Sequence, residues 1–111
     1  MLSQSMEIAF DSLLIRQICE DASHAVQNLG PEVADALMDR LADLDAATAV
    51  TDILLGRPRV IQNETDEVMA IDLCNGYTMV FATNHKNKPT DEDGRIVWDR
   101  VTRVKILQIQ K

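Results

Sequence analysis

Apolar residues in the first half of the chain recur at helical spacing. Between residues 13 and 29 they form one helical face, at Leu14, Ile15, Ile18, Ala22, Ala25, Val26 and Leu29. This spacing predicts a helix over 13–29, broken near Ser23. Gly30 and Pro31 then interrupt the pattern, and Pro31 suits the first turn of a new helix. The second helix has one apolar face, formed by Val33, Leu37, Leu41 and Leu44.

Two shorter segments flank this pair of helices. Residues 6–10, MEIAF, fit either a first strand or the start of a helix. Ala49, Val50, Ile53 and Leu54 indicate a further short helix before Gly56. The first half of the chain is therefore predicted to form an antiparallel helical hairpin with a short helix after it.

After Gly56 the apolar pattern changes to the alternation of strands. Asn75-Gly76 suits the two-residue turn of a β-hairpin because both residues tolerate a positive φ. A hairpin over residues 67–84 with this turn pairs Leu73 with Thr78, Ile71 with Val80 and Ala70 with Phe81. One face then carries Val68, Ala70, Asp72, Cys74, Tyr77, Met79 and Phe81, and the other Met69, Ile71, Leu73, Thr78, Val80 and Ala82. Both faces are mostly apolar, so the helices are expected to cover one face, and a loop or a partner the other.

A polar loop over 85–95 leads to a last strand within 96–109. In that strand Val104 and Ile106 are expected to face one way, and Val101, Leu107 and Ile109 the other. Helices followed by paired strands predict an α+β fold, and 111 residues suffice for a single domain over 1–111.

Charge is distributed unevenly along the chain. Residues 1–56 carry ten acids and two bases, whereas residues 57–111 carry eight acids and nine bases. The first half should repel nucleic acid, and the second half need not. Neither a membrane span nor a signal peptide is visible, so the cytoplasm is the expected compartment. Cys19 and Cys74 belong to no paired motif, and we expect buried thiols rather than a disulfide.

Several segments together resemble the RelE/ParE superfamily of bacterial toxins, and most closely its HigB-like plasmid maintenance system killer proteins. The resemblance lies in IDLCNGYTMVF (71–81), GRIVWDRVT (94–102) and VKILQI (104–109), with LADLDAA (41–47) and GRPR (56–59) in supporting positions. It implies a small twisted antiparallel sheet with an N-terminal helical hairpin against it. It also implies a toxin that cleaves messenger RNA on the ribosome and is neutralised by a co-expressed antitoxin.

The resemblance implies Arg57, Arg59, Tyr77 and His85 as the remaining active-site residues, with no cofactor and no metal. Cleaving RNA through its own 2′-hydroxyl needs proton-transfer groups and cations that stabilise charge on the phosphate. The family places an arginine after the strand aromatic, where this chain has Thr78, and bases near Gln62 and Thr65. Sequences of the family end in a Tyr-His or similar pair, whereas the sequence here ends in Gln110-Lys111. The site is therefore depleted, and we expect little or no cleavage.

Three functions remain open at this stage. The first is a ribosome-dependent endoribonuclease toxin that acts on messenger RNA. The second is a catalytically silent member of the same fold that either inhibits a protein target such as a topoisomerase, as ParE-type relatives do, or holds a partner. The third alternative is an unrelated small α+β domain. The expected partner is a cognate antitoxin, encoded next to this chain and containing a helix-turn-helix, and self-association into a homo-oligomer is the competing possibility.

Overall fold

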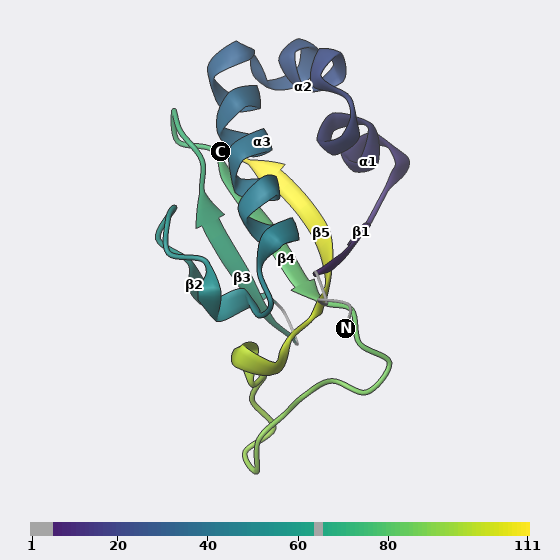
Figure 1. The fold of residues 1–111 in the computed structure, drawn as a ribbon, viewed down its shortest axis with the longest axis vertical. Coiled ribbons are helices and arrows are strands. Elements are labelled where there is room, and N and C mark those ends of the chain that lie inside the picture. Colours follow the sequence, from purple (N-terminus) through teal and green to yellow (C-terminus); the bar gives the residue numbers. More distant parts are fainter. Residues whose placement is uncertain (1–5, 64–65) are drawn as a thin grey trace.

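The computed structural model describes residues 6–63 and 66–111, with the side chain of Asn63 left out. These residues form three α-helices, two short 3-10 helices and a five-stranded sheet (Figure 1). The elements are β1 (Glu7–Phe10), α1 (Leu13–Glu20), α2 (Ala22–Leu29), α3 (Pro31–Ala46), η1 (Val50–Asp52), β2 (Arg59–Asn63), β3 (Asp66–Asp72), β4 (Thr78–Thr83), η2 (Trp98–Arg100) and β5 (Arg103–Gln110). The predicted α+β class is confirmed.

The helical segment over 13–29 is broken at Asp21, two residues before the predicted position. Asp21 ends α1 and caps α2, because its Oδ1 accepts a hydrogen bond from the N–H of Ser23 at 2.8 Å. Gly30, with φ of +86°, turns the chain into α3, and Pro31 occupies the first turn as predicted. The short helix expected before Gly56 is the 3-10 turn η1.

The sheet has the order β1-β5-β4-β3-β2 and is mixed rather than wholly antiparallel. Residues 6–10 contribute a strand, β1, which runs parallel to β5 with Ile8 opposite Val104. The other neighbouring strands are antiparallel. A parallel partner far along the chain cannot be read from local alternation, which explains why the sequence predicted only antiparallel pairs.

The hairpin turns at Asn75-Gly76 as predicted, but its register differs from the prediction by one residue. Asn75 and Gly76 have φ of +54° and +80°. The N–H of Leu73 donates to the carbonyl of Tyr77, and the N–H of Tyr77 donates to the carbonyl of Cys74. Leu73 and Cys74 therefore oppose Tyr77 together. The observed partners are Asp72 with Thr78, Ile71 with Met79, Ala70 with Val80 and Met69 with Phe81.

This shift exchanges the faces of β4 relative to β3, because residues on a strand alternate sides. Met69, Ile71, Met79 and Phe81 pack together in the main core, and Val68, Ala70 and Val80 form a smaller cluster on the other face. The predicted pairings of Leu73 with Thr78, Ile71 with Val80 and Ala70 with Phe81 are wrong.

A second irregularity lies in β5. Val80 is opposite Gln108 while Phe81 is opposite Ile106, so Leu107 has no partner on β4. This bulge returns Ile109 to the side of Ile106, where it packs on the main core, and leaves Leu107 against the smaller cluster. The prediction that Ile109 shares a face with Leu107 is wrong for this reason.

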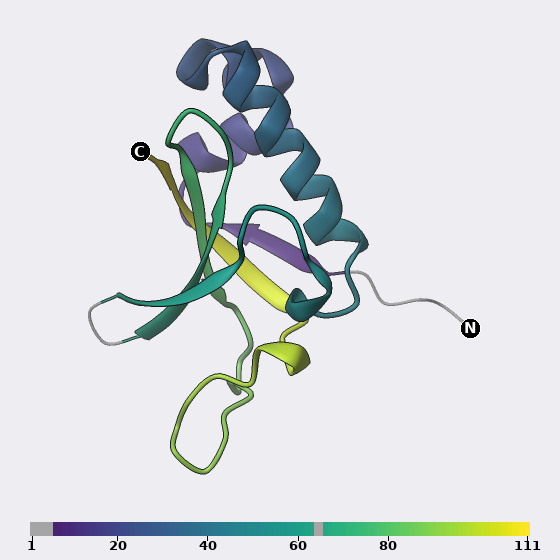
Figure 2. The same ribbon diagram turned by 90° about the vertical axis from the view of Figure 1, so that its left-hand side faces the viewer.

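The helices cover one face of the sheet, as predicted, and α3 crosses it diagonally (Figures 1 and 2). Leu37 and Leu44 of α3 are fully buried in the same core as Ile71, Phe81 and Ile106. On the other face Val68, Ala70 and Val80 are at most 5% exposed, with Ala82 and Leu107 against them. The centre of that face is thus covered within the chain itself, although Ile61, opposite Val68, is 38% exposed. A large exposed apolar face is therefore not an argument for a partner.

Candidate functional site

The site expected from the sequence lies where β3 ends and β4 begins. A shallow pocket of about 400 Å³ opens there, and we call it the arginine pocket. Its lining includes Arg57, Arg59, Asp72, Cys74, Tyr77 and Thr78. Three of the four predicted site residues, Arg57, Arg59 and Tyr77, are therefore brought together.

The loop that carries the two arginines is fixed to the end of β3. Gly56 has φ of +86°, and its carbonyl accepts a 2.6 Å hydrogen bond from the N–H of Asp72. A Cβ at position 56 would lie 2.5 Å from Cγ2 of Ile71 and 2.8 Å from the carbonyl oxygen of Asp72. Only glycine permits this close approach, and Arg57 follows with a positive φ of 49°.

Asp72 binds both arginines. Its Oδ2 accepts from Nε of Arg57 at 2.6 Å, and its Oδ1 lies 3.0 Å from a terminal nitrogen of Arg59. Arg59 stands opposite Ala70, so Asp72 is its diagonal neighbour on the same face of the sheet. The hydrogen bond from Arg57 is the main reason that the pKa of Asp72 lies below its usual range, with a further contribution from Arg59.

The two guanidinium groups are exposed to different degrees. The side chain of Arg57 is 79% exposed and that of Arg59 is 40% exposed. Arg59 also donates to the carbonyl of Arg57 at 3.1 Å, which orders the loop. One carboxylate between two guanidinium groups leaves a net positive charge in the pocket, and the outer side of Arg57 faces solvent.

Tyr77 and Lys111 add to this end of the sheet. Nζ of Lys111 lies over the ring of Tyr77, 5.4 Å from its centroid. Thr78, where the resemblance led us to look for an arginine, is opposite Gln110 on β5 and offers a hydroxyl in place of a cation. Cys74 is half-buried in this pocket, which differs from the expected buried thiol, whereas Cys19 is buried.

The fourth predicted residue, His85, lies outside the arginine pocket. It follows the other end of β4, and a six-residue strand spans roughly 17 Å. Its Nε2 accepts hydrogen bonds from the N–H groups of Thr102 at 3.0 Å and Arg103 at 3.2 Å. His85 therefore connects the polar loop to the start of β5, and a ring bonded in this way presents no proton at Nε2.

Asp72 is the functional residue that the sequence analysis did not single out. It is the only charged residue between Val68 and Phe81, in an otherwise apolar hairpin. An isolated carboxylate in an otherwise apolar hairpin is the signal that indicates a paired charge, although its partners are 13 and 15 positions away in the sequence. Of the polar positions where bases were expected, Gln62 is exposed on β2, and Thr65 lies outside the described residues.

Among the described residues no group of three His, Cys, Asp or Glu side chains is arranged to hold a metal ion, and no helix is long and apolar enough to cross a membrane. Comparison with family profiles, with curated proteins and with solved structures finds no match to this chain.

Proposed function

We propose that this chain is a RelE/ParE-like protein of a bacterial toxin–antitoxin pair, and that it acts in the cytoplasm by binding another protein rather than by cleaving RNA. The observation that carries the proposal is the pairing of Arg57 and Arg59 with one carboxylate, that of Asp72. Cations that stabilise a transition state must be free to meet the charge that develops there. These two already bind a carboxylate, which is the group that an acidic partner segment would offer.

The arginine pocket also contains few side chains that could act as a general acid or base. A general acid or base must lie within hydrogen-bonding reach of the reacting atoms. Tyr77 lies in the arginine pocket, but Nε2 of His85 is engaged at the far end of β4. A single tyrosine cannot both remove the proton of the 2′-hydroxyl and protonate the leaving oxygen in the same step. This arrangement favours binding over catalysis.

The partner that suits the pocket is a segment with aspartate or glutamate side chains, supplied by the antitoxin. A partner carboxylate can add to the exposed side of Arg57, or replace Asp72 between the two arginines. Arg57, Arg59 and Lys111 would then all face the partner. Exposed charges are screened by salt, so apolar contacts must contribute most of the affinity.

Ribosome-dependent cleavage of messenger RNA is the second candidate function. It is favoured by the gathering of Arg57, Arg59, Tyr77 and Lys111 at one end of the sheet, where cations and a phenol could meet a phosphate. The two functions make opposite predictions for RNA. Under the binding proposal, RNA stays intact while the partner complex forms.

The binding proposal is tested with the protein encoded by the adjacent reading frame, purified together with this chain. We expect a stable complex that Arg57→Ala with Arg59→Ala weakens by at least about tenfold, measured by calorimetry. Arg95→Ala with Arg100→Ala is the matched control, because it removes the same charge from exposed positions outside the pocket. A complex that tolerates the first pair of substitutions as well as the second would contradict the proposed site.

A further inference from the structure

Two adjacent leucines stand in solvent between η1 and β2. Leu54 is 84% exposed, the most exposed large apolar side chain among the described residues, and Leu55 is 60% exposed. They border a hollow of about 360 Å³ between the last turn of α3 and segment 53–55, which we call the leucine pocket. Exposed apolar surface beside a hollow is typical of an interaction site.

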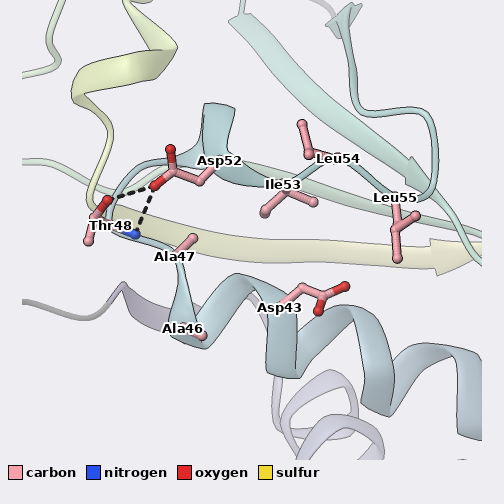
Figure 3. A pocket seen from close by; sticks show the side chains of 8 residues that line it. All are labelled: Asp43, Ala46, Ala47, Thr48, Asp52, Ile53, Leu54 and Leu55. Atoms are coloured by element: carbon pink, nitrogen blue, oxygen red, sulfur yellow. Dashed lines mark hydrogen bonds between the residues drawn. The ribbon is translucent and has the colours of Figure 1, made fainter.

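The leucine pocket is apolar inside and acidic at its rim. Ala46, Ala47 and Ile53 contribute to its apolar lining, and Ala47 and Ile53 are buried. Figure 3 shows Leu55 pointing toward α3 and Leu54 pointing away from it. Asp43 and Asp52 complete the lining. A partner side chain that enters the pocket would contact carbon atoms, and charged groups next to it would lie near the carboxylates.

Hydrogen bonds to Asp52 order residues 48–52 beside the leucine pocket. Oδ2 of Asp52 accepts from the hydroxyl and the N–H of Thr48 at 2.6 and 3.2 Å (Figure 3). It also accepts from the N–H of Ala49 at 3.1 Å. These hydrogen bonds, that of the Thr48 hydroxyl first, hold the pKa of Asp52 below its usual range. Asp52 is therefore an ordered and ionised carboxylate at neutral pH.

Charge around the pocket is predominantly negative. Residues 39–55 contain four carboxylates and one guanidinium, that of Arg40. The side chain of Arg40 is 17% exposed and pairs with Asp43 at 3.1 Å, so it offsets one of the four negative charges and leaves the net charge of the segment negative. A negative rim attracts lysine and arginine and repels phosphate, which excludes RNA as the occupant.

A second copy of this chain also fits poorly. A contact across a two-fold axis uses the same patch on both copies, so it brings the two acidic rims together. Asp43 and Asp52 would then approach the same carboxylates of the other copy. A small apolar ligand could fill the hollow, but it would leave Leu54 in solvent. An extended or helical protein segment covers both leucines and brings its own charges to the rim.

We propose that the leucine pocket docks a segment of another protein that carries apolar side chains flanked by lysine or arginine. This inference stands apart from the function proposed for the arginine pocket, because the two sites select opposite charges. An acidic segment suits Arg57 and Arg59, and a basic segment suits Asp43 and Asp52. The net charge of a probe peptide therefore tells the two sites apart.

The test is a titration of the isotopically labelled protein with the peptide Lys-Lys-Ala-Leu-Leu-Ala-Lys-Lys, capped at both ends, followed by NMR. We expect amide shifts over residues 43–55, and binding at least about tenfold weaker in Leu54→Ser with Leu55→Ser. Leu13→Ser with Leu14→Ser is the matched control, since these leucines are 70% and 55% exposed at the start of α1. The control should bind like the wild type. All four positions are exposed, so each variant should keep its fold, checked by the thermal midpoint.

Charge selection is tested with the same peptide carrying glutamate in place of lysine, and with Asp43→Asn. We expect the acidic peptide to bind at least about tenfold more weakly than the basic one, and the asparagine variant to lose part of the preference. The proposal is overturned if millimolar basic peptide shifts no amide over residues 43–55, or if the leucine variant binds it unchanged. A dimer in light scattering that Leu54→Ser with Leu55→Ser dissociates would also overturn it, because the patch would then belong to a second copy.

Discussion

Asp72 and Arg57 are 15 positions apart and share a 2.6 Å hydrogen bond between Oδ2 and Nε. The backbone reinforces this contact, because the N–H of Asp72 donates to the carbonyl of Gly56. Asp72 thus orders the loop that carries the arginines. It also uses some of the hydrogen-bond donors that the two guanidinium groups could offer to a partner. A partner must either bind beside Asp72 or displace it.

Replacement of Asp72 by asparagine should remove a pH-dependent part of the stability. The folded-state pKa of Asp72 is lowered, so its contribution is present above the unfolded value of about 3.9 and is lost as the pH falls through the folded value. The thermal midpoints of wild type and Asp72→Asn should therefore differ most at neutral pH, and the gap should begin to close below about pH 4. Asp99→Asn, at an exposed position in η2, controls for the loss of one negative charge. A gap that stays constant from pH 7 to acid would contradict the ion pair.

Gly56→Ala should destabilise the protein through a steric clash as well as backbone strain. The added Cβ meets Ile71 and the backbone of Asp72 at distances that real Cβ atoms do not adopt. We expect a loss of about 2–4 kcal/mol in the free energy of unfolding, measured with urea. Gly94→Ala is the matched control, because Gly94 has a similar φ of +82° with nothing within 4 Å of its added Cβ. It should cost about 1 kcal/mol, from the left-handed backbone alone. Equal losses at the two positions would show that Gly56 is not packed against β3 as described.

His85→Ala should weaken the start of β5 without affecting partner binding at the arginine pocket. The substitution leaves the N–H groups of Thr102 and Arg103 without their acceptor. We expect a loss of about 1–2 kcal/mol in the free energy of unfolding and faster hydrogen exchange at these two amides. Lys86→Ala, next to it and exposed, should change the stability by less than about 0.5 kcal/mol. If His85→Ala reduced partner binding while leaving exchange unchanged, His85 would be a binding residue after all.

The two cysteines should differ in reactivity toward iodoacetamide. Burial, with a smaller contribution from Glu20, raises the pKa of Cys19 to about 12, so almost none of its thiol is ionised at pH 8. Cys74 is half-buried in the arginine pocket and should be alkylated first, as mass spectrometry of the digested protein would show. A partner bound at the arginine pocket should slow the alkylation of Cys74. Faster labelling of Cys19 in the folded protein would contradict the packing of α1.

The helices and the hairpin turn were predictable because their signals are local. Helical spacing placed α3, and Asn75-Gly76 placed the turn. The register of the hairpin was not predictable. It depends on a bulge in which Leu73 and Cys74 together oppose Tyr77, and this bulge has no distinct sequence signature. One extra residue was enough to exchange the faces of β4 relative to β3.

The candidate site was predictable in part for a related reason. Arg57, Arg59 and Tyr77 meet because β2, β3 and β4 are neighbours. The expected hairpin joined only β3 and β4, and the pairing of β2 with β3 was not predicted. His85 is separated from them because a strand of six residues lies between the two ends of β4. The binding of Asp72 to both arginines, and the hollow beside Leu54 and Leu55, depend on how loop 53–58 folds back on the sheet. Local periodicity carries no information about that path.

The central claim, that the arginine pocket binds a partner and does not cleave RNA, is tested most directly by primer extension on a message translated by bacterial ribosomes with the purified protein. We predict a pattern identical to that obtained with Arg59→Ala, without new cleavage sites. Ribosome-dependent cleavage by the wild type that Arg59→Ala abolishes would contradict the claim, because the pairing of Arg59 with Asp72 would then be compatible with catalysis.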